Sequence, residues 1–331
     1  MSVIVPEAGL PTTKRFDRET LALGAQKYGA SVVLALLVVI GTIAFPTFAS
    51  VSNVSNIATQ SSFLVIVAAG MTFVILTGGI DLSVGSVFAL GGVLAAYGST
   101  FGPVVALLLP LAACGVIGMI QGFLVAYVGM APFIVTLAGL LGVRGIVFAS
   151  TNAGSNTPIV SDPSFKAIGQ ETLLGVRWPV IIAIVVIIVG TVLLTRSRGG
   201  QSILAVGGSE SAAALMGIAV ARVKFSVYVV SGLFAGLAGA LNAAYSSSGV
   251  PTVGAGLELS AIAAVVIGGT LLTGGRGNLI STVVGVLLLS VIQNLINQVG
   301  SLSSSVQSVV SGLFLAIVVI VQTVLSRTQR L

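Results

Sequence analysis

The sequence is poor in the residues that most enzymes and metal sites need. Among its 331 residues there is no histidine and only one cysteine, Cys114, so no intrachain disulfide can form. The usual ligand sets of zinc and haem are therefore missing, and so are the catalytic arrangements that depend on histidine. We expect no catalytic residue and no metal site, and we do not expect the chain to be an enzyme.

Charged residues are equally scarce. They make up 7% of the chain, against about 25% in soluble proteins, whereas hydrophobic residues make up 56% and the mean hydropathy is +1.16. This composition predicts an all-α polytopic membrane protein, and the 42 glycines favour close helix packing in lipid. The net charge of +6 is then typical of cytoplasmic loops and does not indicate nucleic acid as a partner.

Apolar runs of about bilayer length follow one another and predict about ten transmembrane helices. We expect a single transmembrane domain at 28–325, between a tail at 1–27 and a tail at 326–331, and an exposed polar loop at 50–56. The expected spans are approximately 28–45, 57–77, 83–100, 104–128, 133–150, 178–195, 223–247, 259–273, 278–299 and 305–325.

Lysine and arginine concentrate on one side of this arrangement. With the N-terminus inside, eleven of the fourteen basic residues lie in the two tails, around the loop 196–222 or at Arg276. Only Lys166 and Arg177 fall in the long external loop at 151–177, and Arg144 lies within the fifth span, where the sequence names no partner for it. Basic residues favour the cytoplasmic side, so both termini are expected in the cytoplasm.

A polar turn interrupts the apolar chain at Thr77-Gly78-Gly79-Ile80-Asp81-Leu82-Ser83-Val84-Gly85. Its Asp81 is the only acidic residue between Glu19 and Asp162, and a carboxylate in so apolar a region is costly unless it is paired. Glycine suits the end of one helix, and Asp81 or Ser83 suits the N-cap of the next. The spacing is compatible both with a purely structural turn and with a turn that contacts substrate.

Together with the preceding Gly70-Met71-Thr72-Phe73-Val74-Ile75-Leu76, this turn resembles the signature of bacterial monosaccharide importer permeases. These are the membrane subunits of ribose-, xylose- and galactofuranose-type ATP-binding-cassette importers. A second motif of that family is similar to Val266-Ile267-Gly268-Gly269-Thr270-Leu271-Leu272-Thr273-Gly274-Gly275-Arg276-Gly277, which repeats the Leu-Thr-Gly-Gly of residues 76–79. The resemblance covers about residues 45–325.

The resemblance implies a multi-pass protein of the bacterial inner membrane that moves a monosaccharide by alternating access. Its expected partners are a cytoplasmic ABC ATPase, an external sugar-binding protein and a second permease copy, identical or not. None of the four lysines follows a glycine, so the chain has no P-loop of its own. We therefore expect no cofactor in this chain and place ATP and magnesium in the partner ATPase.

The loop 196–222 contains a short alanine-rich helix, expected at about 210–216. Ser209 suits its N-cap, Glu210 its positive end and Gly217 its C-cap. So short a helix must dock on something, either its own membrane domain or an ATPase. The run Glu210-Ser211-Ala212-Ala213-Ala214-Leu215-Met216-Gly217-Ile218 is similar to the coupling loop of importer permeases, which favours the ATPase.

Uncharged polar side chains within the spans are candidates for a substrate path, because amides and hydroxyls can bond to a polyol. Such side chains also commonly hydrogen-bond one membrane helix to another, so a role in the substrate path and a role in helix packing both stay open for each of them. Gln293 and Asn297 are four residues apart and share one helix face. The candidates are Thr72, Phe73, Gln121, Asn242, Gln293 and Asn297, with Gln60, Thr136 and Asn294 as further polar residues within spans.

Three other functions compete with a sugar permease. A branched-chain amino acid permease of a related importer group has a similar architecture, although the sequence Gly-Gly-Ile-Asp-Leu-Ser favours sugar. A stand-alone ion-coupled carrier would usually need buried acids, and Asp81 is the only one near the spans. A membrane-embedded enzyme is disfavoured by the absence of histidine and the scarcity of acids.

Overall fold

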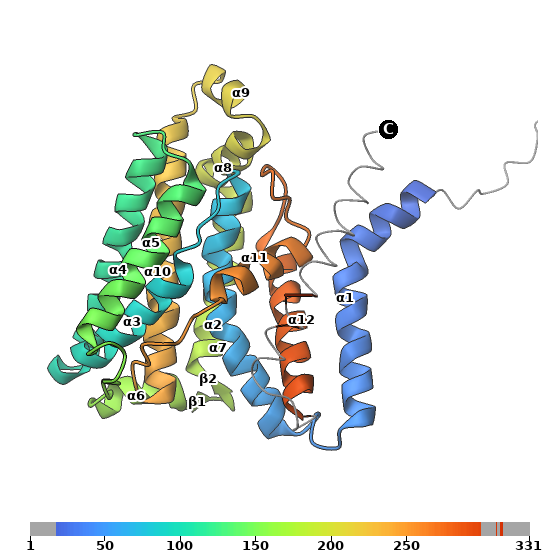
Figure 1. Ribbon diagram of the computed structural model, residues 1–331. Helices are drawn as coiled ribbons and strands as arrows, with labels where there is room; N and C mark the ends of the chain where they lie inside the picture. Colours follow the sequence, from blue (N-terminus) through green and yellow to red (C-terminus); the bar gives the residue numbers. More distant parts are fainter. Residues whose placement is uncertain (1–17, 299–308, 310–311, 314–331) are drawn as a thin grey trace, which may run out of the picture.

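The protein is a bundle of helices, seen in a computed structural model that describes residues 18–298, 309 and 312–313, with side chains from residue 29 (Figure 1). Its main helices stand side by side, and short elements close both ends of the bundle (Figure 1). The elements are α1 (Arg18–Ala44), α2 (Val51–Leu76), α3 (Val84–Gly98), a 3-10 turn (Ser99–Phe101), α4 (Pro103–Ala126), α5 (Pro132–Ser150), α6 (Pro163–Gln170), β1 (Thr172–Leu173), β2 (Val176–Arg177), α7 (Trp178–Arg196), α8 (Arg198–Gly208), α9 (Glu210–Leu215), α10 (Val220–Ser246), α11 (Leu257–Ile267) and α12 (Leu279–Gln298).

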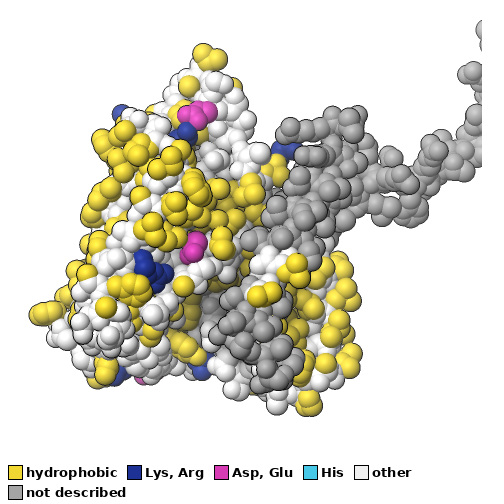
Figure 2. Space-filling model, viewed as in Figure 1, with side chains coloured by type: hydrophobic (Ala, Val, Ile, Leu, Met, Phe, Trp, Pro, Cys, Tyr) yellow, Lys and Arg dark blue, Asp and Glu magenta, His cyan; other side chains and the backbone are white. Residues whose placement is uncertain are grey.

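Seven helical segments of the described part are long and apolar enough to cross a membrane, which confirms a polytopic membrane protein. Figure 2 shows hydrophobic side chains over much of the viewed flank, with charged groups mainly towards its two ends. One acidic and one basic group lie near the middle of that flank (Figure 2). The seven segments are Val51–Leu76, Val84–Phe101, Pro103–Ala126, Pro132–Ser150, Trp178–Arg196, Val220–Ser246 and Leu279–Gln298.

The polar segment 50–56 is not the exposed loop that its composition predicted. Ser50 caps α2, its side chain accepting a hydrogen bond from Asn53 N, and the helix runs from Val51 through this segment. Asn53 and Asn294 on α12 exchange side-chain amide bonds of 3.1 and 2.8 Å. Asn294 thus supplies the hydrogen bonds that water would supply to Asn53 in an exposed loop. The polar segment can therefore be part of helix α2.

The predicted span at 259–273 is also wrong. The structure has only the 11-residue α11 there, about half the length that a bilayer crossing needs. Gly256, with a φ of +77°, begins this helix, and two glycine turns at 268–277 follow it. The helix α1 begins at Arg18 and so includes part of the predicted tail 1–27. The predicted span at 305–325 and the tail at 326–331 lie outside the described residues, apart from isolated positions.

The helix α10 occupies the centre of the bundle and packs against α2, α3 and α4. Close backbone contact with α4 depends on glycine: a Cβ on Gly118 would meet Tyr228 O, and one on Gly232 would meet Cys114 O. The small residues of α10 and the Gly118–Gly122 pair of α4 therefore make contacts within this chain.

The two ends of the bundle differ. The helices α8 and α9 lie at one end, and α6 lies with the β1–β2 hairpin at the other (Figure 1). The α6 helix lies within the predicted loop 151–177, with Asp162 accepting from Phe165 N at its start. Arg144 on α5 also finds partners, because its NH1 donates to Pro251 O and Val253 O.

Candidate functional site

The polar turn between α2 and α3 is organised by Asp81, which is 1% exposed. Its Oδ1 accepts from Ser83 N over 3.0 Å and lies 2.7 Å from Ser83 Oγ, and its Oδ2 accepts from Ser231 Oγ over 2.7 Å. Ser231 belongs to the central helix α10, so the carboxylate ties the turn to the core. Three donors offset the cost of burying this acid.

The caps of this turn are only partly as predicted. Gly78 ends α2 with a φ of +78°, as a C-cap glycine should. Ser83 occupies the N-cap of α3 but makes no side-chain cap bond, because its hydroxyl points to Asp81 and lies 3.2 Å from Gln121 Oε1. Gly85, the second residue of α3, lies against the start of α11 and the segment before it: a Cβ there would meet Gly254 O and Glu258. This geometry favours a structural role for the turn, since Ser83 and Ser231 already donate hydrogen bonds to the Asp81 carboxylate.

A polar cavity of about 270 Å³ lies between α2, α10, the start of α11 and α12. Side-chain amides enter it from three helices, and the rings of Phe63 and Phe88 belong to its wall. No charged residue lines it within the described part of the chain. The lining residues are Asn56, Ile57, Gln60, Phe63, Leu64, Phe88, Asn242, Val253, Gly254, Leu257, Ser260, Ser290, Gln293, Asn294 and Asn297.

Three of these amides are available to a ligand. The side chains of Gln60, Asn242 and Gln293 make no hydrogen bond to another described residue. Asn294 differs from them, because its amide is paired with Asn53. Asn56 accepts from Arg177, which also approaches the ring of Tyr245 at 5.5 Å. Donors and acceptors beside aromatic rings suit a neutral, polyhydroxylated ligand.

Three of the six predicted path residues line this cavity: Asn242, Gln293 and Asn297. The other three lie elsewhere. Thr72 Oγ1 donates to Ala68 O and lies 3.0 Å from Thr282 Oγ1, while Phe73 lines an apolar pocket beside α7 and α10. Gln121 is buried next to the Asp81 turn, where its Nε2 has no partner among the described residues.

Sequence reasoning left Asn56 out of the spans and named Gln60 only as a further polar residue within one. They stand four residues apart on α2, as Gln293 and Asn297 do on α12. The same spacing argument would have found them if residues 50–56 had been assigned to the helix.

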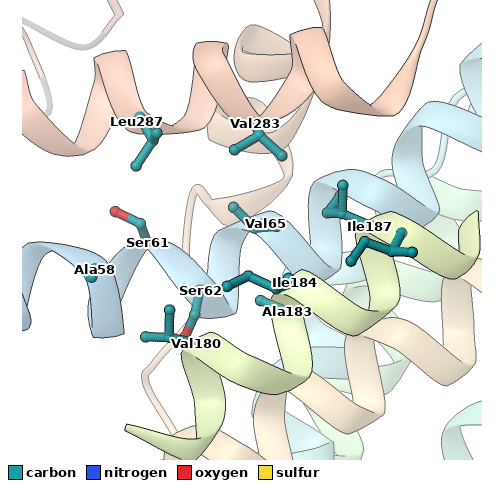
Figure 3. Close-up of a pocket in the computed structure, with 11 residues that line it drawn as sticks. Ala58, Ser61, Ser62, Val65, Val180, Ala183, Ile184, Ile187, Val283 and Leu287 are labelled. Carbon is teal, nitrogen blue, oxygen red and sulfur yellow. The ribbon is translucent and has the colours of Figure 1, made fainter. Parts of the chain in front are cut away.

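A second pocket, of about 210 Å³, lies between α2, α7 and α12 and is apolar (Figure 3). Its only polar side chains, Ser61 and Ser62, donate their hydroxyls to Ile57 O and Thr59 O over 2.6 Å each. Among the described residues that line it, no side-chain hydrogen-bond donor is left for a ligand, so the pocket suits apolar groups best. Figure 3 shows the aliphatic side chains around it, among them Val65, Ile184 and Leu287.

The expected helix of the loop 196–222 is α9. Its N-cap is Ser209 as predicted, whereas its C-cap is Met216, one residue before the predicted Gly217. Ser209 Oγ accepts from Ala212 N, and Gly217 follows the helix with a φ of +79°. The sequence did not reveal α8, which precedes it. Glu210 pairs with Lys224 on α10 at 2.6 Å, and Ala213 is buried.

Within the described part of the chain, the outer face of α9 is exposed. Leu215 is 90% exposed and Met216 69% exposed, at the tip of the structure (Figure 1). Ser211, Ala212 and Gly217 are exposed beside them, and Ile218 is partly buried.

Comparison with known proteins shows the family of this chain. The family described as "Branched-chain amino acid transport system / permease component" matches residues 53–320, which is most of the chain. The chain belongs to this permease family. It is thus a membrane permease and not itself an enzyme, as the sequence predicted.

Several similar proteins are named as sugar import permeases. The chain is 41% identical over 297 residues to the ribose import permease RbsC of Bacillus subtilis, covering 89% of this chain and 92% of that protein. It is 40% identical to the inner membrane ABC transporter permease YjfF of Escherichia coli K12, covering 84% and 86%. It is 35% identical to the fructose import permease FruG of Bifidobacterium longum, covering 88% and 89%. No solved structure matches.

Proposed function

We propose that this permease is the membrane subunit of an ATP-driven monosaccharide importer, and that the sugar passes through the cavity between α2, α10, α11 and α12. The amides of Gln60, Asn242 and Gln293, which bond to no other described residue, carry the proposal, because they present donors and acceptors without charge. The ribose and fructose permeases among the relatives support the same substrate class.

The amino acid alternative fits this cavity less well. A free amino acid brings an ammonium and a carboxylate, and burying either without a partner is costly. The lining holds no charged residue, within the described part of the chain, that could pair with either group. An ion-coupled carrier is also disfavoured, since three donors hold Asp81 and it does not line the cavity.

The ATPase docks on α9. The exposed Leu215 and Met216 form an apolar contact at the end of the bundle that also bears Arg196, Arg198 and Arg222. Basic residues favour the cytoplasmic side, so this end is cytoplasmic and the end with α6 is external. The external sugar-binding protein then delivers substrate at the α6 end.

The second permease copy covers the face shown in Figure 2. An acidic and a basic group near the middle of that flank would be costly against lipid. Arg144 and Glu258 are both only partly buried, and a second copy or a water-filled path between the copies removes that cost.

Docking is tested by purifying the tagged chain from native membranes in mild detergent and identifying bound proteins by mass spectrometry. We expect an ABC ATPase with the wild type and at least a tenfold loss of it with Leu215→Asp, because a charge replaces an apolar contact. Leu174→Asp is the matched control, since Leu174 is 97% exposed but lies in the hairpin at the opposite end. A wild-type preparation free of any ATPase would sink the proposal.

The substrate class is tested in proteoliposomes that contain the whole complex. D-ribose, D-fructose and D-xylose are offered as radiolabelled sugars, with L-leucine as the competing class. Uptake of a sugar that depends on ATP and on Gln293 supports the proposal. Uptake of leucine alone would assign the chain to the amino acid importers.

A further inference from the structure

Three glycine-containing turns meet at the end of the bundle that carries α9. They are the end of α2 at Leu76–Gly78, the end of α8 at Gly207–Gly208 and the turn at Gly274–Gly275 between α11 and α12. Gly275 N donates to Leu76 O over 2.9 Å, so the two Leu-Thr-Gly-Gly repeats of the sequence touch through their backbones.

The end of α8 closes this junction. A Cβ on Gly207 would meet Leu76 O and Gly275 N. A Cβ on Gly275 would come within 2.8 Å of Gly208 Cα, and one on Gly274 within 2.8 Å of Gly78 N. Real Cβ atoms essentially never approach backbone so closely, so only glycine allows the three turns to meet.

The junction stands between the proposed docking helix and the cavity. Gly208 is followed directly by Ser209, the N-cap of α9. The helix α2 lines the cavity at its far end with Asn56 and Gln60, and both α11 and α12 contribute to the cavity wall. Two residues, Gly208 and Ser209, thus separate α9 from the close backbone contacts that Gly207 makes with the end of α2 and with the turn that joins α11 to α12.

We infer that Gly207, Gly274 and Gly275 are positioning residues that make one backbone junction, through which a displacement of α9 moves α2 and the α11–α12 segment. The physical reason is the absence of side chains at the contact. A contact between side chains can absorb a small shift by changing rotamer, whereas touching backbones in a close-packed interior must move together. This inference rests on the proposed docking of an ATPase at α9.

The first matched pair is Gly207→Ala and Gly208→Ala. The two residues are neighbours in α8, and neither has a positive φ. A methyl on Gly207 pushes into Leu76 O, whereas a methyl on Gly208 has nothing within 4 Å. Helix propensity changes equally in both variants, so their difference reports the junction contact.

The second pair has matched backbone strain. Gly274 and Gly78 have φ values of +85° and +78°, so alanine is disfavoured at both. A Cβ on Gly274 meets Gly78 N at 2.8 Å, whereas a Cβ on Gly78 meets only Thr273 O, at an ordinary 3.6 Å. Gly274→Ala should therefore disturb the junction more than Gly78→Ala does.

The assay uses the complete complex in proteoliposomes and measures ATP hydrolysed per molecule of D-ribose, or of whichever test sugar the wild type takes up. We expect Gly207→Ala and Gly274→Ala to bind the ATPase within twofold of wild type but to raise this ratio at least tenfold. Gly208→Ala should match the wild type, and Gly78→Ala should stay within threefold of it.

Equal ratios within both pairs would overturn the inference while leaving ATPase docking intact. If Gly207→Ala fails to fold, the Gly274 and Gly78 pair decides. If Gly274→Ala also fails to fold while Gly78→Ala folds, the junction serves folding and the inference is wrong. A wild type that binds no ATPase would instead remove the proposed function itself.

Discussion

The helix α2 faces two pockets of comparable size and opposite chemistry. Asn56, Gln60 and Leu64 form one stripe at a spacing of four and line the polar cavity of about 270 Å³. Ala58, Ser61, Ser62 and Val65 form the neighbouring stripe and line the apolar pocket of about 210 Å³ (Figure 3).

The two stripes differ in whether their polar atoms are already bonded. The side chains of Ser61 and Ser62 are short enough to bond carbonyls of their own helix, so their hydroxyl donors are already bonded within α2. The amide of Gln60 extends into the cavity and makes no bond to a described residue. We therefore expect polar residues in a span to mark a path where no described residue satisfies them.

The largest effect is expected from removing the free amides. In the double variant Gln60→Leu with Gln293→Leu, each lost neutral hydrogen bond to sugar costs about 0.5–1.5 kcal/mol, so uptake should fall roughly tenfold or more. Thermal stability in detergent should not fall, because neither amide bonds a described residue. The measurement is the initial rate of radiolabelled D-ribose uptake at a concentration below KM, and wild-type rates would contradict the assignment.

An intermediate effect, on stability and not on uptake, is expected from a substitution of Thr72, whose hydroxyl is already hydrogen-bonded within the protein. Thr72→Val keeps the shape and removes the hydroxyl that lies 3.0 Å from Thr282 Oγ1. Unfolding should become easier by about 1 kcal/mol, while uptake stays within twofold of wild type. Thermal inactivation in detergent measures the first quantity. A large loss of uptake at unchanged stability would return Thr72 to the substrate path.

The smallest effect is expected next to Gln60, at Ser61. Ser61→Ala removes only a hydroxyl bonded to Ile57 O of the same helix, so stability should change by no more than about 0.5 kcal/mol and uptake not at all. Comparing the uptake of this variant with that of a Gln60→Ala single variant tests whether the two stripes differ in function, because residues 60 and 61 are neighbours on different stripes. Equal losses of uptake would show that the stripes do not differ in function.

Local signals in the sequence predicted several parts of the structure. Ser209 and Gly217 bound α9 as capping rules require, because a cap depends only on the nearest few residues. Gly78 ends α2 for the same reason. Seven of the ten predicted spans match helices long enough to cross a membrane, with boundaries shifted by a few residues, since hydropathy is a property of a whole window.

The failures have one cause, which is contact between distant segments. Residues 50–56 looked like a loop, but Asn53 finds Asn294 on α12 and the helix continues. The run at 259–273 looked long enough to span, but Gly268 and Gly269 end α11 early, against α12, where a Cβ on Gly268 would meet Ser281 and Thr282. Gln121, a predicted path residue, instead accepts from Ser83 in the Asp81 turn and does not line the polar cavity.

By itself, the sequence determined the membrane class, the two Leu-Thr-Gly-Gly turns and the short helix of the loop 196–222, because composition and caps act over a few residues. Only the tertiary structure decided that these turns meet at the end of α8, and which amides face a common cavity. Hydrogen bonds and close backbone contacts between residues hundreds of positions apart, such as Leu76 and Gly275, exist only once the helices have packed.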